Sequence, residues 1–334
     1  MIRFALIGAG RIGMMHAQNI IENNNCKLIT VYDANRENAL KVSRLANCNI
    51  ANTPEEAIKN NEVNAVFIAS STDTHVKFII MAAQAEKPIL CEKPIDLDIN
   101  KVEECKEFLK KYNVQIQIGF NRRFDASNQR IKKGIDNGDI GKLEMIVITS
   151  RDPSPSTLEY HRTSGGLFRD CTIHDFDLSR YLLGNDKIVQ INAFASQLFS
   201  DDIKSIDDHD TAMIQMKSRN GVLIHINNSR RAVYGYDQRL EVFGSKGMLI
   251  SNNQTPNSVE IFNKNQTFAK DPILDFFIDR YDQAYKSQLN DFIIKVKNKE
   301  NISVNFEDGR LALILANEAY RSLEEKRNIE INYE

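Results

Sequence analysis

The sequence predicts an α/β protein of two domains: a doubly wound parallel sheet at the N-terminus, then a C-terminal α+β domain with a mostly antiparallel sheet. Two observations support this prediction. Over residues 1–120, short apolar segments alternate with segments of helical spacing, whereas after Gly119 several strand-like segments follow one another directly. Alternation is typical of parallel sheets covered by helices, and direct succession of strands is typical of antiparallel pairing.

The first domain, residues 1–120, contains short and almost wholly apolar strands. They are expected at residues 2–7, 28–32, 65–69, 89–91 and 114–119. The connecting helices are expected at residues 12–21, 36–46, 54–59, 75–85 and 102–111. Such a sheet binds its ligand beyond the carboxyl ends of its strands, so functional residues are expected there.

The second domain, residues 121–334, has a different order of elements. Its helices are expected at residues 126–137, 168–183, 279–297 and 306–326, and a polar loop at 152–166. Its strands are expected at residues 143–150, 188–197, 210–217, 222–229 and 239–243, with a hairpin turn at Arg219-Asn220-Gly221. The last helix is assigned to this domain, with the alternative that it packs back on the first.

Composition and charge exclude several classes of protein. The 43 Lys and Arg nearly balance 45 Asp and Glu, so neither nucleic acid nor an anionic membrane is an expected partner. The apolar runs are shorter than the ~20 residues of a membrane span. Met1 leads directly into a strand-like segment, so no signal peptide is expected. Five cysteines without a Cys-x-x-Cys pattern fit free thiols in the cytoplasm. His161, His209 and His225 lack metal-ligand spacing, so no metal is expected.

Residues 2–7 run directly into Gly8-Ala9-Gly10-Arg11-Ile12-Gly13, and a helical segment follows. This strand–turn–helix context is the one that a dinucleotide-binding Rossmann fold requires. Gly8 allows the tight turn, Gly10 lets the pyrophosphate approach the backbone, and Gly13 lets the helix lie close to the sheet. The helix N-terminus offers N–H groups to the phosphates. We expect the whole loop, including Arg11 and Ile12, to bind the cofactor.

Asp33 ends the second strand, 20 residues after Gly13. A carboxylate at this place accepts hydrogen bonds from an adenosine ribose and repels a 2′-phosphate, so the expected cofactor is NAD rather than NADP. Arg36 would weaken that preference by contacting a phosphate. The alternative interpretation is that the glycines form a purely structural turn and Asp33 caps the next helix.

Further motifs lie at the ends of strands and on the helix expected at 168–183. They are Thr74-His75, Cys91-Glu92-Lys93-Pro94, Gly119-Phe120-Asn121-Arg122-Arg123-Phe124-Asp125, and the run from Gly165-Gly166 through Asp170 to His174-Asp175-Phe176-Asp177. With these motifs the sequence resembles, over essentially its whole length, the Gfo/Idh/MocA oxidoreductases, two-domain NAD(P)-dependent enzymes that act on sugars and cyclitols. Within that family, the segments Gly119–Asp125, Ser150-Arg151-Asp152-Pro153 and Tyr234-Gly235-Tyr236-Asp237 look most like those of the inositol 2-dehydrogenases.

The resemblance implies that Lys93 lies beside the nicotinamide and the reacting hydroxyl, and that the Lys93–Pro94 peptide is cis. It also implies that Ser70, His75 and Glu92 line the dinucleotide. For His75, a structural role near the start of a helix remains an equal alternative.

Asp170 and His174 are four residues apart on the expected helix, so their side chains share one face. A histidine is suited to accept a hydroxyl proton, and a carboxylate can orient that histidine or the substrate. Lys93 adds positive charge where alkoxide character develops. The expected catalytic residues are therefore Lys93, which follows the strand at 89–91, and Asp170 and His174 on the helix at 168–183. That helix is expected to cross the mouth of the first domain's crevice. Without the resemblance, a surface pair would be the favoured interpretation.

Substrate contacts are expected from Lys93, Asp170 and His174, together with Arg122, Asp152 and Tyr236; Tyr160 is a weaker candidate. A polyol needs several fixed donors and acceptors, and these side chains supply them. Ordinary surface or interdomain contacts are the alternative for Arg122, Asp152, Tyr160 and Tyr236.

The function expected from the sequence is NAD-dependent oxidation of a ring hydroxyl of myo-inositol or a related cyclitol. The alternatives are a dehydrogenase or reductase of another sugar or cyclitol, and a non-catalytic dinucleotide sensor, which would not need Lys93, Asp170 and His174 together. The antiparallel sheet leaves one face without helices, so a homo-oligomer, dimer or tetramer, is expected.

Overall fold

The computed structural model describes residues 1–333, and they form two compact units. Unit 1 contains Met1–Asn121 and Gln283–Leu313, and unit 2 contains Arg122–Asp282 and the chain from Ile314 onward. Each unit is therefore built from two segments that are distant in the sequence.

Unit 1 contains a six-stranded sheet in the order β3-β2-β1-β4-β5-β6, and every pairing is parallel. The strands are β1 (Ile2–Ile7), β2 (Cys26–Tyr32), β3 (Asn49–Ile50), β4 (Ala65–Ile68), β5 (Ile89–Cys91) and β6 (Ile116–Ile118). This order is that of a dinucleotide-binding doubly wound sheet. The predicted fold class of the N-terminal half is confirmed.

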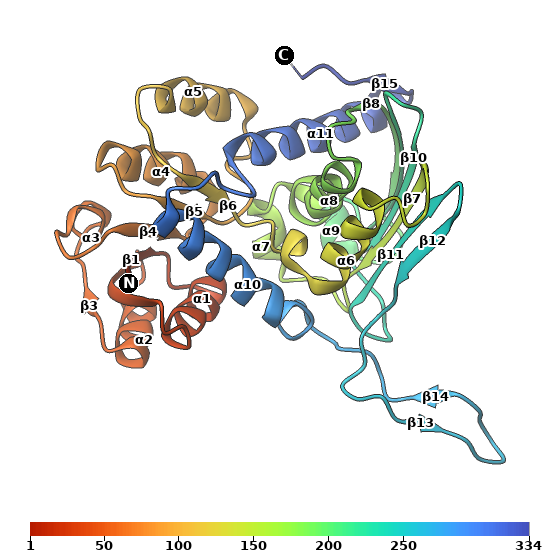
Figure 1. The fold of residues 1–334 in the computed structure, drawn as a ribbon, viewed down its shortest axis with the longest axis horizontal. Coiled ribbons are helices and arrows are strands. Elements are labelled where there is room, and N and C mark those ends of the chain that lie inside the picture. Colours follow the sequence, from red (N-terminus) through yellow and green to blue (C-terminus); the bar gives the residue numbers. More distant parts are fainter. Residues whose placement is uncertain (334) are drawn as a thin grey trace. The chain divides into compact units, whose positions relative to one another are not determined.

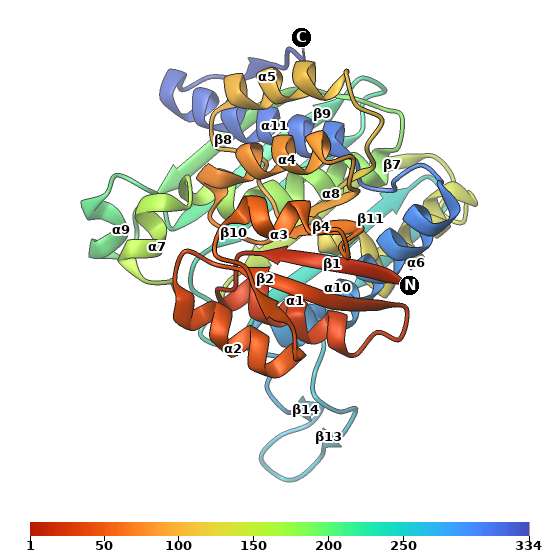
Figure 2. The same ribbon diagram turned by 90° about the vertical axis from the view of Figure 1, so that its left-hand side faces the viewer.

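Five helices connect these strands: α1 (Arg11–Ile21), α2 (Arg36–Ala46), α3 (Pro54–Lys59), α4 (His75–Gln84) and α5 (Ile99–Leu109). Figure 2 shows β1 and β2 side by side, with α1 and α2 next to β2. The second segment of unit 1 carries most of α10 (Phe277–Asn298). Its Leu289, Phe292 and Ile293 pack into the core formed by β1 and β4, so the distant segment completes this unit's core.

Unit 2 contains a seven-stranded sheet in the order β12-β11-β7-β10-β9-β8-β15. The strands are β7 (Leu143–Arg151), β8 (Ile188–Ser196), β9 (Thr211–Ser218), β10 (Leu223–Ser229), β11 (Asp237–Gly244), β12 (Gly247–Ser251) and β15 (Ile329–Glu330). The β7–β10 pair is parallel and the other pairs are antiparallel. The prediction of a mostly antiparallel sheet is confirmed.

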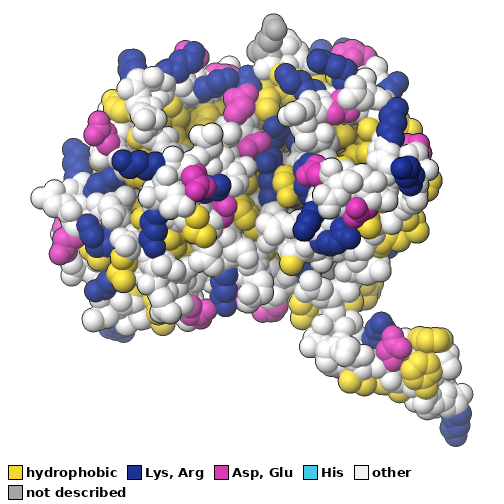
Figure 3. All heavy atoms as spheres, in the orientation of Figure 1, with side chains coloured by type: hydrophobic (Ala, Val, Ile, Leu, Met, Phe, Trp, Pro, Cys, Tyr) yellow, Lys and Arg dark blue, Asp and Glu magenta, His cyan; other side chains and the backbone are white. Residues whose placement is uncertain are grey.

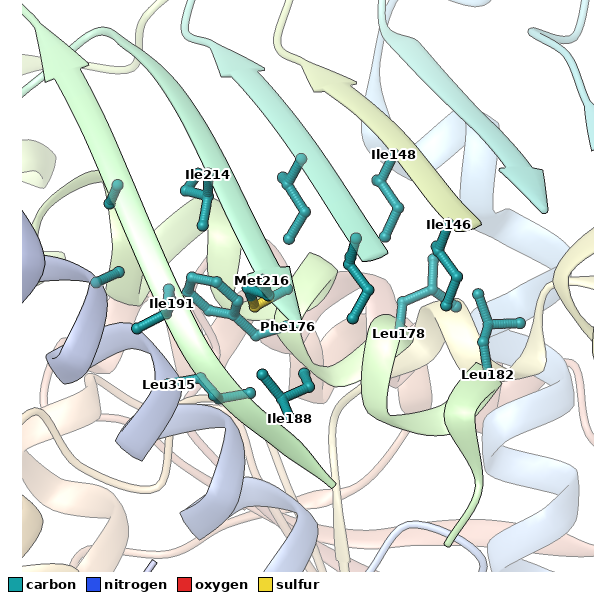
Figure 4. Close-up of a cluster of buried hydrophobic side chains, with 14 of the residues drawn as sticks. Ile146, Ile148, Phe176, Leu178, Leu182, Ile188, Ile191, Ile214, Met216 and Leu315 are labelled. Carbon is teal, nitrogen blue, oxygen red and sulfur yellow. The ribbon is translucent and has the colours of Figure 1, made fainter. Parts of the chain in front are cut away.

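Helices cover one face of this sheet (Figure 1). They are α6 (Ala126–Asp136), α8 (Ile173–Leu183) and α11 (Phe306–Glu325). Figure 4 shows Phe176 and Leu182 of α8 and Leu315 of α11 packed against isoleucines of β7, β8 and β9. Burial alternates along the strands, as in β9, because successive side chains point to opposite faces.

The opposite face of the seven-stranded sheet carries exposed apolar side chains. Leu223, Met145, Phe243 and Met248 are cross-strand neighbours on β10, β7, β11 and β12, and all four are exposed. A hairpin of β13 (Glu260–Ile261) and β14 (Ala269–Lys270) also projects from unit 2 and carries hydrophobic side chains (Figures 1 and 3).

Two parts of the second domain differ from the expectation. The predicted polar loop at 152–166 contains a helix, α7 (Leu158–Thr163), because the Thr157 side chain caps its N-terminus by accepting from the Tyr160 N–H at 3.4 Å. The predicted helix at 168–183 begins with a π-helical turn, Phe168–Thr172, before α8. The sequence also did not predict the short helix α9 (Asp201–Ser205) or the short strands β3, β12, β13, β14 and β15.

Candidate active site

The glycine loop after β1 has little room for side chains. Gly8 has φ +97°, and a Cβ there would lie 2.4 Å from the Ser70 backbone nitrogen. A Cβ on Gly13 would lie 2.1 Å from the Gly8 carbonyl oxygen, whereas one on Gly10 would meet nothing within 4 Å. Open space therefore lies at Gly10, the N-cap of α1, which no side chain caps. This is the shape that a pyrophosphate at a helix N-terminus requires, so the loop fits a dinucleotide.

Asp33 lies directly beside this loop. Its Oδ2 accepts the Ala9 N–H at 2.6 Å and its Oδ1 accepts the Asn35 N–H at 2.7 Å. Helix α2 is capped by Asn35, whose side chain accepts the Glu37 N–H at 3.0 Å. The cap of α2 is therefore Asn35 and not Asp33, so the alternative interpretation of Asp33 is wrong. The carboxylate is half-buried and joins the end of β2 to the glycine loop.

Lys93 is half-buried, two residues beyond the end of β5, and the Lys93–Pro94 peptide is cis, as the resemblance implied. The residues on either side of Lys93 are each bonded to a histidine. Glu92 Oε1 lies 2.7 Å from Nε2 of His16 on α1, and the Pro94 carbonyl lies 2.7 Å from Nδ1 of His75 on α4. The backbone that carries Lys93 is therefore held from two helices.

His75 is buried, and its second ring nitrogen, Nε2, lies 3.0 Å from the Ser70 carbonyl oxygen. Both ring nitrogens thus contact backbone carbonyl groups and link the chain after β4 to the chain after β5. The Ser70 hydroxyl bonds to the Thr74 hydroxyl at 2.7 Å. These contacts support the structural role of His75, and its contact with a dinucleotide stays a prediction.

In unit 2, Asp170 lies in the π-helical turn and His174 follows in the first turn of α8. π-Helical turns inside helices are frequent at functional sites. Asp170 Oδ1 accepts the Tyr160 hydroxyl at 2.7 Å, and its Oδ2 accepts from Nη1 of Arg230 at 3.3 Å. Burial and the neighbouring Asp170 carboxylate raise the pKa of Tyr160 well above its ordinary value, so Tyr160 remains a proton donor.

Asp152 lies close to the same group of side chains. The Cys171 thiol donates to Asp152 Oδ2 at 3.4 Å. Burial raises the pKa of Asp152, while the positive charge of Arg230 opposes that rise. The structure therefore brings two of the expected site residues, Asp152 and Asp170, together around Arg230.

Arg122 and Tyr236 also meet in unit 2. Arg122 is buried; it forms an ion pair with Asp175, and its Nη2 donates to Ser150 Oγ at 3.1 Å and to the Tyr236 hydroxyl at 3.5 Å. Asp175 also accepts from Asn228 Nδ2 at 2.8 Å. These contacts support the alternative, a structural role for Arg122, and leave its contact with substrate a prediction.

The sequence analysis did not identify several side chains that hold the site: His16, Arg230 and Asp208. Of these three, only His16 could have been found from the local sequence, because it follows the glycine loop on the first turns of α1.

Within residues 1–333, no group of three or more His, Cys, Asp or Glu side chains is arranged to hold a metal ion. None of the helices in that range combines the length and apolar character needed to cross a bilayer.

Comparison with known families matches both halves of the chain. The pattern described as an oxidoreductase family with an NAD-binding Rossmann fold matches residues 2–120. The pattern of the GFO/IDH/MocA C-terminal domain matches residues 128–250.

Individual relatives match along the full length. An inositol 2-dehydrogenase from Rhizobium meliloti (strain 1021) is 42% identical and is covered to 99%, as is this chain. The crystal structure of a myo-inositol dehydrogenase from Corynebacterium glutamicum ATCC 13032 has a TM-score of 0.96 at 42% identity, with both chains fully covered. A scyllo-inositol dehydrogenase from Lactobacillus casei, solved with NAD(H) and scyllo-inositol, has a TM-score of 0.92 at 26% identity and 99% coverage of each chain.

The glycine loop, the Glu92-Lys93-Pro94 motif and these full-length matches lead to one conclusion: the chain belongs to the Gfo/Idh/MocA family of NAD-binding oxidoreductases.

Proposed function

We propose that the protein oxidises a ring hydroxyl of myo-inositol, or of a closely related cyclitol, to the ketone with NAD. One observation carries the proposal: full-length relatives at 42% identity are inositol dehydrogenases by name. This chain also has a lysine, an aspartate and a histidine suited to alcohol oxidation, at Lys93, Asp170 and His174.

NAD, when bound, supplies the acceptor for the hydride that leaves the carbinol carbon. The hydroxyl proton passes to the neutral imidazole of His174 as the C=O bond forms. The Lys93 ammonium stabilises negative charge on the reacting oxygen, and Asp170 orients the imidazole or the substrate.

Several polar groups of unit 2 are proposed to bind the remaining ring hydroxyls. Asp152, Arg122 and Tyr236 offer acceptors and donors in fixed positions, since Arg122 is tied to Asp175 and Ser150. Such a site rejects ligands that lack hydroxyls, because its buried polar groups are then left without partners.

The substrate prediction follows from these groups. The value of kcat/KM for myo-inositol is expected to exceed that for cyclohexanol by about 10⁴-fold. The test measures NADH formation across myo-inositol, scyllo-inositol, aldoses and cyclohexanol. Equal activity on cyclohexanol would contradict a site built for hydroxyls, and preference for an aldose would favour the alternative of a sugar dehydrogenase. NAD binding without turnover on any polyol would favour a dinucleotide sensor.

Cofactor choice gives a second prediction. Replacing Asp33 with alanine removes the negative charge that repels a 2′-phosphate, so the preference for NAD over NADP in kcat/KM is expected to fall by about tenfold or more. Asn35→Ala is the matched control, since it removes the cap of α2 without changing the charge. Tighter binding of NADP than of NAD by the unmodified protein would contradict this assignment.

We also propose that the protein is a homo-oligomer, a dimer or tetramer with the homotetramer favoured, which acts in the cytoplasm in inositol catabolism. The exposed apolar neighbours Leu223, Met145, Phe243 and Met248 support self-association through the open sheet face, because large exposed apolar patches mark interaction sites. The five cysteines, which form no disulfide within the described residues, support a reducing compartment.

A further inference from the structure

Arg230 is a fully charged side chain buried in unit 2, with 2% of its surface exposed. It follows β10, and its backbone N–H donates to the Asp210 carbonyl at 2.8 Å. Its guanidinium contacts two separate parts of the chain, Asp170 with the adjacent Cys171 and Asp208 with the adjacent His209. Nη1 contacts Asp170 Oδ2 at 3.3 Å, Nη2 contacts Asp208 Oδ2 at 3.1 Å, and Nε donates to the His209 carbonyl at 3.3 Å.

The ion pair of Arg230 with Asp208 also contacts the backbone that leads to Asp170. Asp208 Oδ1 accepts the backbone N–H of Leu167 at 2.9 Å, immediately before the π-helical turn. Gly166 precedes Leu167 with φ +81°, and a Cβ there would lie 2.8 Å from Asp208 Oδ1. Arg230 therefore links Asp208, which bonds the backbone at the start of the turn, to the Asp170 carboxylate within the turn.

The balance of charge around Asp170 depends on Arg230. The other ionisable groups next to Asp170 or Arg230 are Tyr160 and His161 on α7, Cys171, Asp152 after β7 and Asp208 before β9. His174 follows Asp170 by one turn at the start of α8. Burial and Arg230 lower the pKa of His161, and burial raises the pKa of Tyr160, so both side chains are neutral near pH 7. Arg230 thus provides positive charge to a region that contains three carboxyl groups.

We infer that Arg230 is a positioning residue for Asp170: its guanidinium keeps the Asp170 carboxylate charged and in a fixed orientation, together with the Tyr160 hydroxyl. The inference rests on the proposed function, in which Asp170 acts on the imidazole or the substrate. Removing Arg230 leaves Asp152, Asp170 and Asp208 near one another without its charge. Carboxyl groups in that position take up protons at higher pH, and a protonated Asp170 loses its orienting charge.

The test compares Arg230→Met with Arg230→Lys and with the double variant Arg230→Met/Asp208→Asn. Removing one partner of a buried ion pair is strongly destabilising, whereas removing both is tolerated far better, so the double variant keeps the test open if the single variant fails to fold. The matched control is Arg123→Met/Asp177→Asn, which removes another buried ion pair of unit 2. In that pair Arg123 Nε and Nη2 donate to the two carboxylate oxygens of Asp177, on α8, at 2.8 and 2.6 Å.

For Arg230→Met and for the double variant, kcat for myo-inositol at pH 7 is expected to fall about 10–100-fold. The acid limb of the pH–rate profile, which His174 sets in the unmodified protein, is expected to move up by about one pH unit, because loss of activity through protonation of Asp170 is then added to protonation of His174. NAD affinity, measured by titration without substrate, stays unchanged. Arg230→Lys keeps the limb near its original pH. The control double variant lowers the Tm and leaves the limb in place.

A measurement without turnover separates this inference from the proposed function. An infrared titration of the carboxyl C=O band, made on Arg230→Met/Asp208→Asn with and without Asp170→Asn, reports the protonation of Asp170 directly. The midpoint for Asp170 is expected to lie about one pH unit above that of the protein with Arg230. An unchanged midpoint and an unchanged pH–rate limb would overturn the inference. A shifted midpoint in a protein that oxidises no inositol would support the role of Arg230 and refute the proposed function.

Discussion

Replacing His174 with alanine is expected to lower kcat for myo-inositol oxidation by about 10²–10⁴-fold, the usual contribution of a positioned acid–base group. The physical reason is that no other neutral imidazole takes the hydroxyl proton in the proposed mechanism. NAD affinity should remain nearly unchanged, because the substitution leaves the glycine loop and Asp33, which are expected to bind the cofactor, as they are.

The matched control for this variant is His225→Ala. His225 lies on β10, is half-buried and has no role in the proposed chemistry, so kcat should stay near that of the unmodified protein. The measurement is steady-state NADH formation at saturating NAD, normalised to folded protein. Near-normal turnover of His174→Ala would mean that another group is the base, and neutral Lys93 would then be the better candidate.

Replacing Lys93 with methionine is expected to lower kcat by about 10²–10³-fold, the range seen when one donor to a developing oxyanion is removed. Methionine keeps an unbranched side chain but carries no charge, so the effect reports on electrostatic stabilisation of the reacting oxygen. The bonds of Glu92 and Pro94 to His16 and His75 do not involve the Lys93 side chain.

The control for this variant is Lys93→Arg, which keeps a positive charge and should retain more activity than Lys93→Met. The readout is kcat for myo-inositol, with the Tm of each variant to show that folding is unaffected. Equal kcat values for Lys93→Met and the unmodified protein would remove Lys93 from the mechanism.

The fold of unit 1 could be predicted because its signals are local. Buried strands such as β1 and β4 are continuous apolar runs, and the glycine loop fixes the strand–turn–helix unit by its backbone requirements. The positions of Asp33 and Lys93 at strand ends follow from the same pattern. The sequence pattern did not predict that residues 283–313 belong to this unit. Leu289 and Phe292 join the core around β1 only in the tertiary fold, and no local pattern reports such contacts.

The site in unit 2 was harder to predict because long-range contacts build it. The π-helical turn begins where Asp208 accepts the Leu167 N–H, and Asp208 is 41 residues away in the sequence. Arg230 has no local motif, and an arginine is seldom fully buried unless it is paired. The hairpin of β13 and β14 has strands of two residues, too short to show a period.

The pH dependence of kcat in three proteins measured side by side tests the central claim most directly: that the proton of a ring hydroxyl passes to His174 while Lys93 stabilises the oxygen. Only neutral imidazole accepts a proton, so the rate rises with pH through the pKa of the base. The account predicts a rising limb in the unmodified protein and in Lys93→Met, and its loss in His174→Ala. A rising limb that persists unchanged in His174→Ala would contradict it.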